Sequence, residues 1–153
     1  MRPNIGRAML GGFVGTLAIT LMMYQLGPMM GMMKMDIAES LGKMTGMGWM
    51  AGMMIHFLNG TIIFPLLYAF LLYRVLPGGP VVKGTTWGVI LWLIAQLMVM
   101  PMMGGGMFSS KMGGMMTVGG SLIGHLLYGA LLGAIGGSEE SPVTVQRTGV
   151  PVA

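Results

Sequence analysis

Residues 49–73 read WMAGMMIHFLNGTIIFPLLYAFLLY and contain no lysine, arginine, aspartate or glutamate. About twenty mainly apolar residues allow a helix to cross roughly 30 Å of hydrocarbon, so this stretch predicts a membrane span. The chain breaks soon after it, because the prolines and glycines of LPGGP at 76–80 cannot continue a helix. Comparable apolar runs occupy residues 8–26, 85–103 and 117–137, and the sequence therefore predicts four spans.

The composition agrees with a membrane protein. The 153 residues are 54% hydrophobic and 8% charged, with a mean hydropathy of +0.79, which leaves too few charges to cover a water-soluble globule. The chain has no cysteine, which excludes disulfides, thiolate zinc sites, iron–sulfur clusters and cysteine nucleophiles. The net charge of +4 comes from basic residues scattered between apolar runs. Basic residues scattered in this way are more typical of signals that orient spans in a membrane than of a nucleic-acid-binding surface, so we expect no nucleic-acid partner.

The two halves of the chain resemble each other. Residues 28–31 and 101–104 both read PMMG and lie 73 residues apart, whereas His56 and His125 lie 69 residues apart in corresponding spans. Each half has an even number of spans, so the two copies would point the same way through the membrane. We predict an all-α polytopic membrane protein, a four-helix bundle of two tandem helical hairpins that form a parallel internal repeat, with halves at about 8–73 and 84–137.

Domain limits and orientation follow from polarity and charge. Residues 1–137 would form a single transmembrane domain, and the polar, proline-containing residues 138–153 predict a disordered tail. The positive-inside rule places the more basic face in the cytoplasm, which gives an inner-membrane protein with both termini cytoplasmic. The basic residues divide into Arg2, Arg7, Arg74, Lys83 and Arg147 on that face, and Lys34, Lys43 and Lys111 on the other.

A short amphipathic segment is predicted between the first two spans. Asp36 precedes Glu39 by three residues, and Ile37, Leu41 and Met44 recur at helical spacing. This pattern is typical of a capping box that opens a helix lying in the outer interface. The alternative is that Asp36 and Glu39 are metal or proton ligands, since they are the acids outside the tail, although the second half has no counterparts.

The two histidines are candidate functional residues. His56 and His125 are each followed by glycine four residues later and would lie at similar depth in their spans. An ionisable residue within a span is a functional hypothesis by default, and two imidazoles in a bundle core could be axial ligands of haem b. The alternative is a pair of neutral histidines that hydrogen-bond to a neighbouring span or to a carbonyl, with Asn59, Gln96, Ser121 and Thr20 as candidate partners.

Methionine is the second candidate ligand type, with 22 residues in the chain. Thioethers are soft ligands that select Cu(I), which makes a copper site near the outer face a hypothesis. Its candidate ligands are Met29, Met30, Met102, Met103, Met112 and Met116. The alternative is that methionine serves as a flexible filler against glycine-rich helices, because methionines also occur inside the spans.

No catalytic pattern is found, so we expect a small accessory or interaction protein without enzymatic activity. Glycine pairs at four-residue spacing, such as Gly84 and Gly88 or Gly129 and Gly133, predict close helix contacts. The expected partners are the lipid bilayer and either a second copy of the chain or another membrane protein. We expect no cofactor, the alternative being haem b or copper.

Four segments of the chain resemble one known family. They are PMMGMMKMDIAESLG at 28–42, GWMAGMMIHFLNG at 48–60, WLIAQLMVMPMMGGG at 92–106 and GHLLYGALLGAIGG at 124–137. They resemble a family of small four-helix bacterial and archaeal membrane proteins known only as a domain of unknown function, and the resemblance extends over residues 8–137. It implies the four-helix architecture, and it implies no activity.

Overall fold

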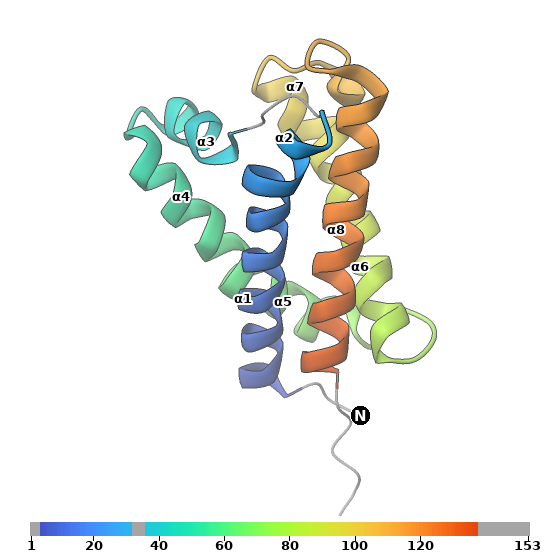
Figure 1. The fold of residues 1–153 in the computed structure, drawn as a ribbon. Helices are drawn as coiled ribbons and strands as arrows, with labels where there is room; N and C mark the ends of the chain where they lie inside the picture. The colour runs from blue at the N-terminus through green and yellow to red at the C-terminus, as the bar shows by residue number, and fades with distance from the viewer. Residues whose placement is uncertain (1–3, 32–35, 138–153) are drawn as a thin grey trace, which may run out of the picture.

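The computed structural model describes residues 4–31 and 36–137, in which every regular element is a helix. Within these residues four helices are long and apolar enough to cross a membrane, and they confirm the four predicted spans (Figure 1). The first, third and fourth begin several residues before the predicted limits. The tail predicted at 138–153 lies outside the described residues, as do Arg2, Lys34 and Arg147. The four spans are Ile5–Met29, Gly48–Leu72, Pro80–Met102 and Gly114–Gly136.

Three of the spans are interrupted by π-helical turns, whereas the fourth is one continuous helix. The first span consists of α1 (Ile5–Leu21), a π-helical turn (Met22–Leu26) and α2 (Gly27–Met29). The short helix α3 (Ile37–Thr45) follows it. The second span consists of α4 (Gly48–Leu58), a π-helical turn (Asn59–Ile63), α5 (Phe64–Leu67) and a further π-helical turn (Tyr68–Leu72). The remainder comprises α6 (Pro80–Ile94), a π-helical turn (Ala95–Val99), α7 (Met100–Met102), a 3₁₀ turn (Met107–Ser109) and α8 (Gly114–Gly136).

Proline explains three of the four π-helical turns. Pro28, Pro65 and Pro101 each follow the end of such a turn by two residues. Proline has no N–H group and its ring clashes with the carbonyl four residues earlier, and the wider turn relieves both conflicts. The turns before Pro28 and Pro101 lie 73 residues apart, the spacing of the two PMMG segments. The first and third spans therefore share one local geometry, while the wider internal repeat stays a prediction.

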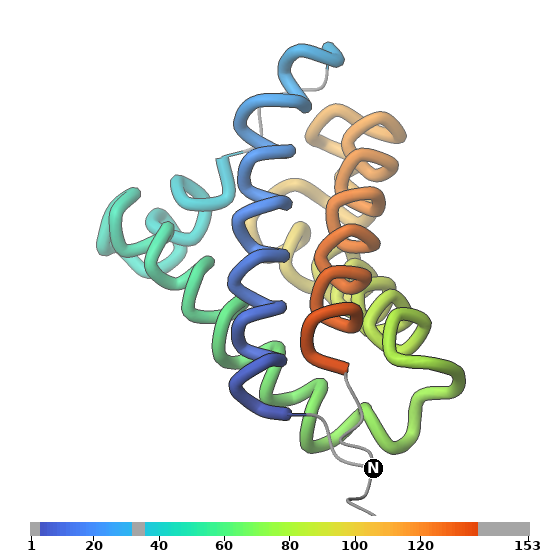
Figure 2. The backbone as a smooth tube through the Cα atoms, turned by 60° about the horizontal axis from the view of Figure 1, so that its bottom comes forward, coloured from blue at the N-terminus to red at the C-terminus, as the bar shows by residue number. Residues whose placement is uncertain are grey.

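The helix α8 lies between α1 and α6, and glycines allow the close contact on both sides (Figures 1 and 2). A Cβ atom at Gly129 would collide with backbone atoms of Gly84 and Gly88 on α6. On the other side, a Cβ atom at Gly15 of α1 would lie 2.8 Å from the ring of Tyr128. These contacts confirm the close packing that the glycine pairs predict, and they lie between spans of the same chain.

The half of the bundle near the start of α1 has a well-packed core. The rings of Tyr68 and Tyr73 meet edge to face, with centroids 5.6 Å apart. Arg7 Nε donates to the carbonyl oxygen of Ile135 at 3.0 Å, so the start of the first span and the end of the last lie at one end of the molecule. The buried cluster consists of Ala8, Tyr68, Tyr73, Trp87, Leu91, Tyr128 and Leu132.

The opposite half is more open, because the second span leans away from α1. Of the second span, helix α1 contacts mainly residues 59–67 and makes little contact with α4 (Figures 1 and 2). Helix α3 packs on α4 instead, and a Cβ atom at Gly52 would collide with the carbonyl group of Ala38. Asp36 caps α3 by accepting from the Glu39 N–H at 2.9 Å, which confirms the predicted cap. The divergence of α4 leaves space among the spans in this half.

Candidate functional site

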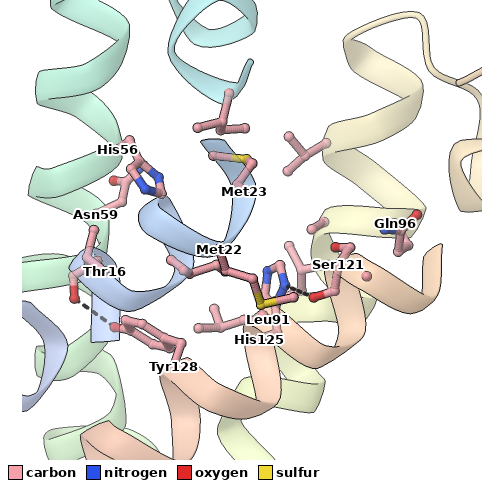
Figure 3. Close-up of a pocket in the computed structure, with 18 of the residues that line it drawn as sticks. Thr16, Met22, Met23, His56, Asn59, Leu91, Gln96, Ser121, His125 and Tyr128 are labelled. Atoms are coloured by element: carbon pink, nitrogen blue, oxygen red, sulfur yellow. Dashed lines mark hydrogen bonds between the residues drawn. The ribbon is translucent and has the colours of Figure 1, made fainter. Parts of the chain in front are cut away.

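A cavity of ≈ 260 Å³ occupies that space, and residues of all four spans and of α3 line it (Figure 3). Its surface is mainly apolar, with Ile37 and Leu41 of α3 contributing to one wall. Six of its polar side chains come from the second, third and fourth spans. They are His56, Asn59, Gln96, Thr117, Ser121 and His125.

The cavity brings together the two histidines that the sequence singled out. His56 comes from α4 and His125 from α8, and both side chains point into the cavity from different walls (Figure 3). His56 Nε2 lies 3.0 Å from Thr20 Oγ1, and His125 Nδ1 lies 2.8 Å from the carbonyl oxygen of Ser121. Each histidine thus has a hydrogen-bond partner of the kind predicted. Haem ligation by the pair stays a prediction.

Hydroxyl groups at the cavity wall nearest the core donate to backbone carbonyls. Thr16 Oγ1 donates to the Gly12 carbonyl at 2.7 Å, and Tyr128 OH donates to the Gly60 carbonyl at 2.7 Å. The Gly60 carbonyl lies at the π-helical turn before Pro65. The buried hydroxyl of Tyr128 therefore links α8 to the irregular part of the second span.

On the opposite wall, a strained loop holds Gln96. Ser109 Oγ donates to Gln96 Oε1 at 3.0 Å, and both side chains are buried. The loop places Phe108 and Ser109 at φ values of 50° and 51°, a region that non-glycine residues rarely adopt. The ring of Phe108 packs against Trp92. The Gln96 carbonyl oxygen is thereby turned to the loop.

Thr117 was not predicted as a site residue. Its side chain is 4% exposed, and its hydroxyl has no hydrogen-bond partner among the described residues. A buried hydroxyl without a partner is destabilising by roughly 1–3 kcal/mol. Thr117, Ser121 and His125 follow one another at four-residue spacing on α8, and that polar stripe within an apolar span is the signal by which the sequence could have revealed it.

The predicted copper ligands do not line the cavity. Met29 and Met116, for example, are exposed near the ends of the first and fourth spans, with 82% of Met29 accessible. Met22, Met23 and Met100 line the cavity instead. The six methionines outside it are Met29, Met30, Met102, Met103, Met112 and Met116. Cu(I) binding by these six stays a prediction.

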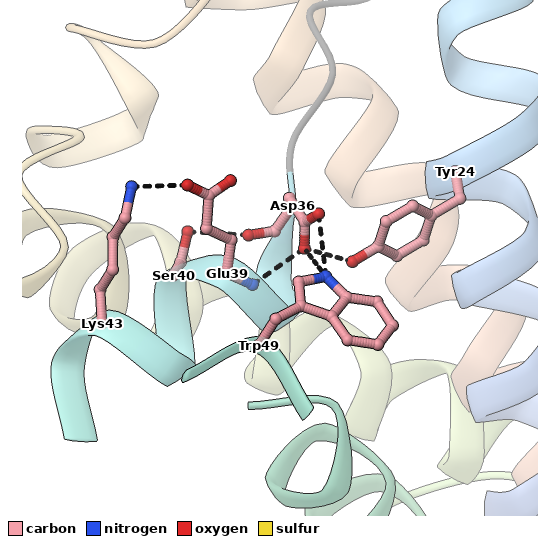
Figure 4. Close-up of polar contacts among 6 residues, drawn as sticks. All are labelled: Tyr24, Asp36, Glu39, Ser40, Lys43 and Trp49. Atoms are coloured by element: carbon pink, nitrogen blue, oxygen red, sulfur yellow. Dashed lines mark hydrogen bonds and ion pairs between the residues drawn. The ribbon is translucent and has the colours of Figure 1, made fainter. Parts of the chain in front are cut away.

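A polar cluster anchors α3 beside the cavity (Figure 4). The Asp36 carboxylate accepts from the Tyr24 hydroxyl, and both of its oxygens lie 3.1 Å from Trp49 Nε1. Tyr24 belongs to the first span and Trp49 to the second, so Asp36 links α3 to both. This role adds to the predicted cap, and the sequence showed no sign of the Tyr24 and Trp49 contacts. Binding of a metal ion or a proton by Asp36 and Glu39 stays a prediction.

These features define an all-α integral membrane protein in which four spans surround a mainly apolar cavity. The chain belongs to a family of unknown function, DUF6789, whose model matches residues 3–143. No curated protein and no solved structure matches the chain.

Proposed function

We propose that this protein is a non-enzymatic binding protein of the cell inner membrane, which holds a small, mainly apolar molecule between its four spans. The observation that carries the proposal is the cavity of ≈ 260 Å³ with apolar walls and a few converging polar side chains. Small-molecule sites have this character, and the volume lies just below the range of roughly 300–1,000 Å³ typical of them, which suits a small ligand. A ligand of this kind is concentrated in the bilayer, and the divergence of α4 from α1 leaves the space that it would occupy.

Filling the cavity is expected to abolish binding. Ala95 lines the cavity, so the ring of Ala95→Phe would occupy the ligand's space. Equilibrium partition of 4-butylanisole into nanodiscs with and without the protein measures binding of an uncharged apolar probe. We expect saturable binding to the wild type and at least a tenfold loss in Ala95→Phe. Leu93→Phe is the control, because Leu93 lies outside the cavity lining and is 39% exposed. Equal affinity in Ala95→Phe and the wild type would contradict the proposal.

Haem b or copper is the second candidate ligand, and it is supported by the presence of two imidazoles in one cavity. His56 and His125 would hold a haem if one were bound there. Met22 and Met23 add soft ligands beside them, in place of the six outer methionines considered from sequence. A Soret band in purified protein, lost in both His56→Ala and His125→Ala, would assign the cavity to haem. Stoichiometric copper by elemental analysis would assign it to the metal.

The proposed orientation places both chain ends in the cytoplasm. It is supported by Arg7, which contacts Ile135 at the end where the first span begins and the last one ends. Because the chain has no cysteine, a single cysteine introduced by substitution is the one site that a maleimide can label, and its labelling reports on which side of the membrane it lies. We expect a membrane-impermeant maleimide to label Ser110→Cys in intact cells, and to label Gly79→Cys only after permeabilisation. Both positions are exposed, in loops on opposite sides of the third span. The reverse pattern would place both chain ends outside.

A further inference from the structure

We propose that the cavity selects molecules that donate hydrogen bonds, such as an apolar molecule with a phenolic hydroxyl group. The geometry points to this class because the hydrogen bonds around His56 and His125 leave each ring with one bare acceptor nitrogen. The inference rests on the proposed binding function and adds to it the chemical class of the ligand.

The acceptor on His125 follows from its backbone contact. Its Nδ1 lies 2.8 Å from the carbonyl oxygen of Ser121, and a carbonyl oxygen only accepts hydrogen bonds. The ring proton of the neutral imidazole therefore lies on Nδ1, and Nε2 carries the lone pair. A neutral ring is favoured because a charge within a span is costly, and no carboxylate is among the described residues that line the cavity.

The acceptor on His56 follows from a chain of two contacts. Thr20 Oγ1 lies 2.6 Å from the carbonyl oxygen of Thr16, so the threonine hydroxyl proton lies between these two oxygens. The Thr20 oxygen can then only accept in its 3.0 Å contact with His56 Nε2. His56 is consequently protonated on Nε2, and its Nδ1 is bare. The two histidines thus have opposite tautomers, and each retains one acceptor nitrogen.

Other polar groups around the cavity support the same ligand class. The hydroxyl protons of Thr16 and Tyr128 are already donated to backbone carbonyls. No side-chain hydrogen bond to either imidazole is made by the other side chains of the described lining that carry donors, which are Asn59, Gln96, Thr117 and Ser121. The volume of ≈ 260 Å³ and the mainly apolar walls suit an organic molecule better than a bare ion.

The test compares probes that differ in one group. In nanodiscs, we expect 4-butylphenol to bind the wild type about tenfold more tightly than 4-butylanisole, the effect of one hydrogen bond worth about 1.4 kcal/mol. The ketone 4-butylacetophenone, which only accepts, should bind no more tightly than the anisole. In the double variant His56→Leu/His125→Leu, which removes both acceptor nitrogens, the affinity for the phenol should fall to the same variant's affinity for the anisole.

The possible results separate the two proposals. If the anisole binds and the phenol shows no advantage, or if the ketone binds most tightly, the donor-selective site is wrong while the binding function stands. If no probe binds, the proposed binding function is wrong, and the inference falls with it. Binding of copper or haem with exclusion of all three probes would assign the histidines to that ligand.

The tautomers themselves are measurable without any ligand. In protein labelled with ¹⁵N-histidine, NMR should show His125 protonated on Nδ1 and His56 protonated on Nε2. Thr20→Val removes the acceptor of His56 and should change the His56 signals, whereas Thr20→Ser keeps the hydroxyl and should preserve them. Protonation of His125 on Nε2 in the wild type would overturn the inference, whether or not any variant folds.

Discussion

Replacing Gly129 with alanine is expected to lower the free energy of unfolding by about 3 kcal/mol, the upper range for overpacking a tight contact. The new Cβ atom would collide with the Gly84 carbonyl oxygen. The same Cβ atom would lie 2.9 Å from the Gly84 carbonyl carbon and 3.0 Å from the Gly88 nitrogen. These are backbone atoms, which cannot rotate away as a side chain can. The helices α6 and α8 would have to separate, and the wall of the cavity that carries His125 would move with α8.

Thermal unfolding in mild detergent measures this effect, and the same helix supplies the control. Gly119 of α8 has no atom within 4 Å of the position where its Cβ would lie. Gly119→Ala should therefore leave the stability unchanged or raise it slightly, because alanine favours a helix over glycine by roughly 1 kcal/mol. Equal destabilisation by both substitutions would show that close packing of α6 on α8 is not what Gly129 provides.

Replacing Asp36 with alanine is expected to detach α3 from the bundle, at a loss of about 4 kcal/mol, the lower end of the sum of the contributions that it removes. The substitution removes the helix cap, worth about 1 kcal/mol, and the carboxylate that accepts from Tyr24 and Trp49, where each such bond to a charged group contributes roughly 1.5–3 kcal/mol. Because Ile37 and Leu41 of α3 line the cavity, its release should also weaken the binding of 4-butylanisole.

Limited proteolysis and Trp49 fluorescence measure the release of α3. We expect faster cleavage around α3 in Asp36→Ala, together with a shift of the Trp49 emission towards that of indole in water. Glu39→Ala is the matched control, because Glu39 forms an ion pair with Lys43 at the surface. The Glu39 side chain is 54% exposed and the Lys43 side chain is 76% exposed. Such a pair contributes less than about 1 kcal/mol. Similar cleavage rates in both variants would refute the role of Asp36 as the anchor.

The parts of the fold that were predicted depend on local patterns. The four spans follow from the length of the apolar runs, and α3 follows from the spacing of Asp36 and Glu39. Close helix contacts were predicted from glycine pairs at helical spacing, and the structure shows one such contact between Gly84 and Gly129. Each of these signals lies within a few turns of one helix.

The candidate site was predicted only in part. His56 and His125 were identified because a histidine is conspicuous in an apolar span, and the structure places both in one cavity. Two features were missed, the Thr117 hydroxyl, which has no hydrogen-bond partner in the described part of the chain, and the contact between Ser109 and Gln96. The first could have been found from the four-residue spacing of Thr117, Ser121 and His125, whereas the second depends on a loop with unusual backbone angles that leaves no periodic pattern in the sequence.

The sequence by itself determined that this chain crosses the membrane four times, because the length and polarity of each segment decide whether it can enter hydrocarbon. Only the tertiary structure decided that the spans enclose a cavity. The space exists because glycines allow α8 to pack close to α1 and α6, whereas α4, which precedes the π-helical turn at Asn59–Ile63, diverges from α1. Packing of this kind depends on the distances between helices, and those distances are determined jointly by residues that lie far apart in the chain.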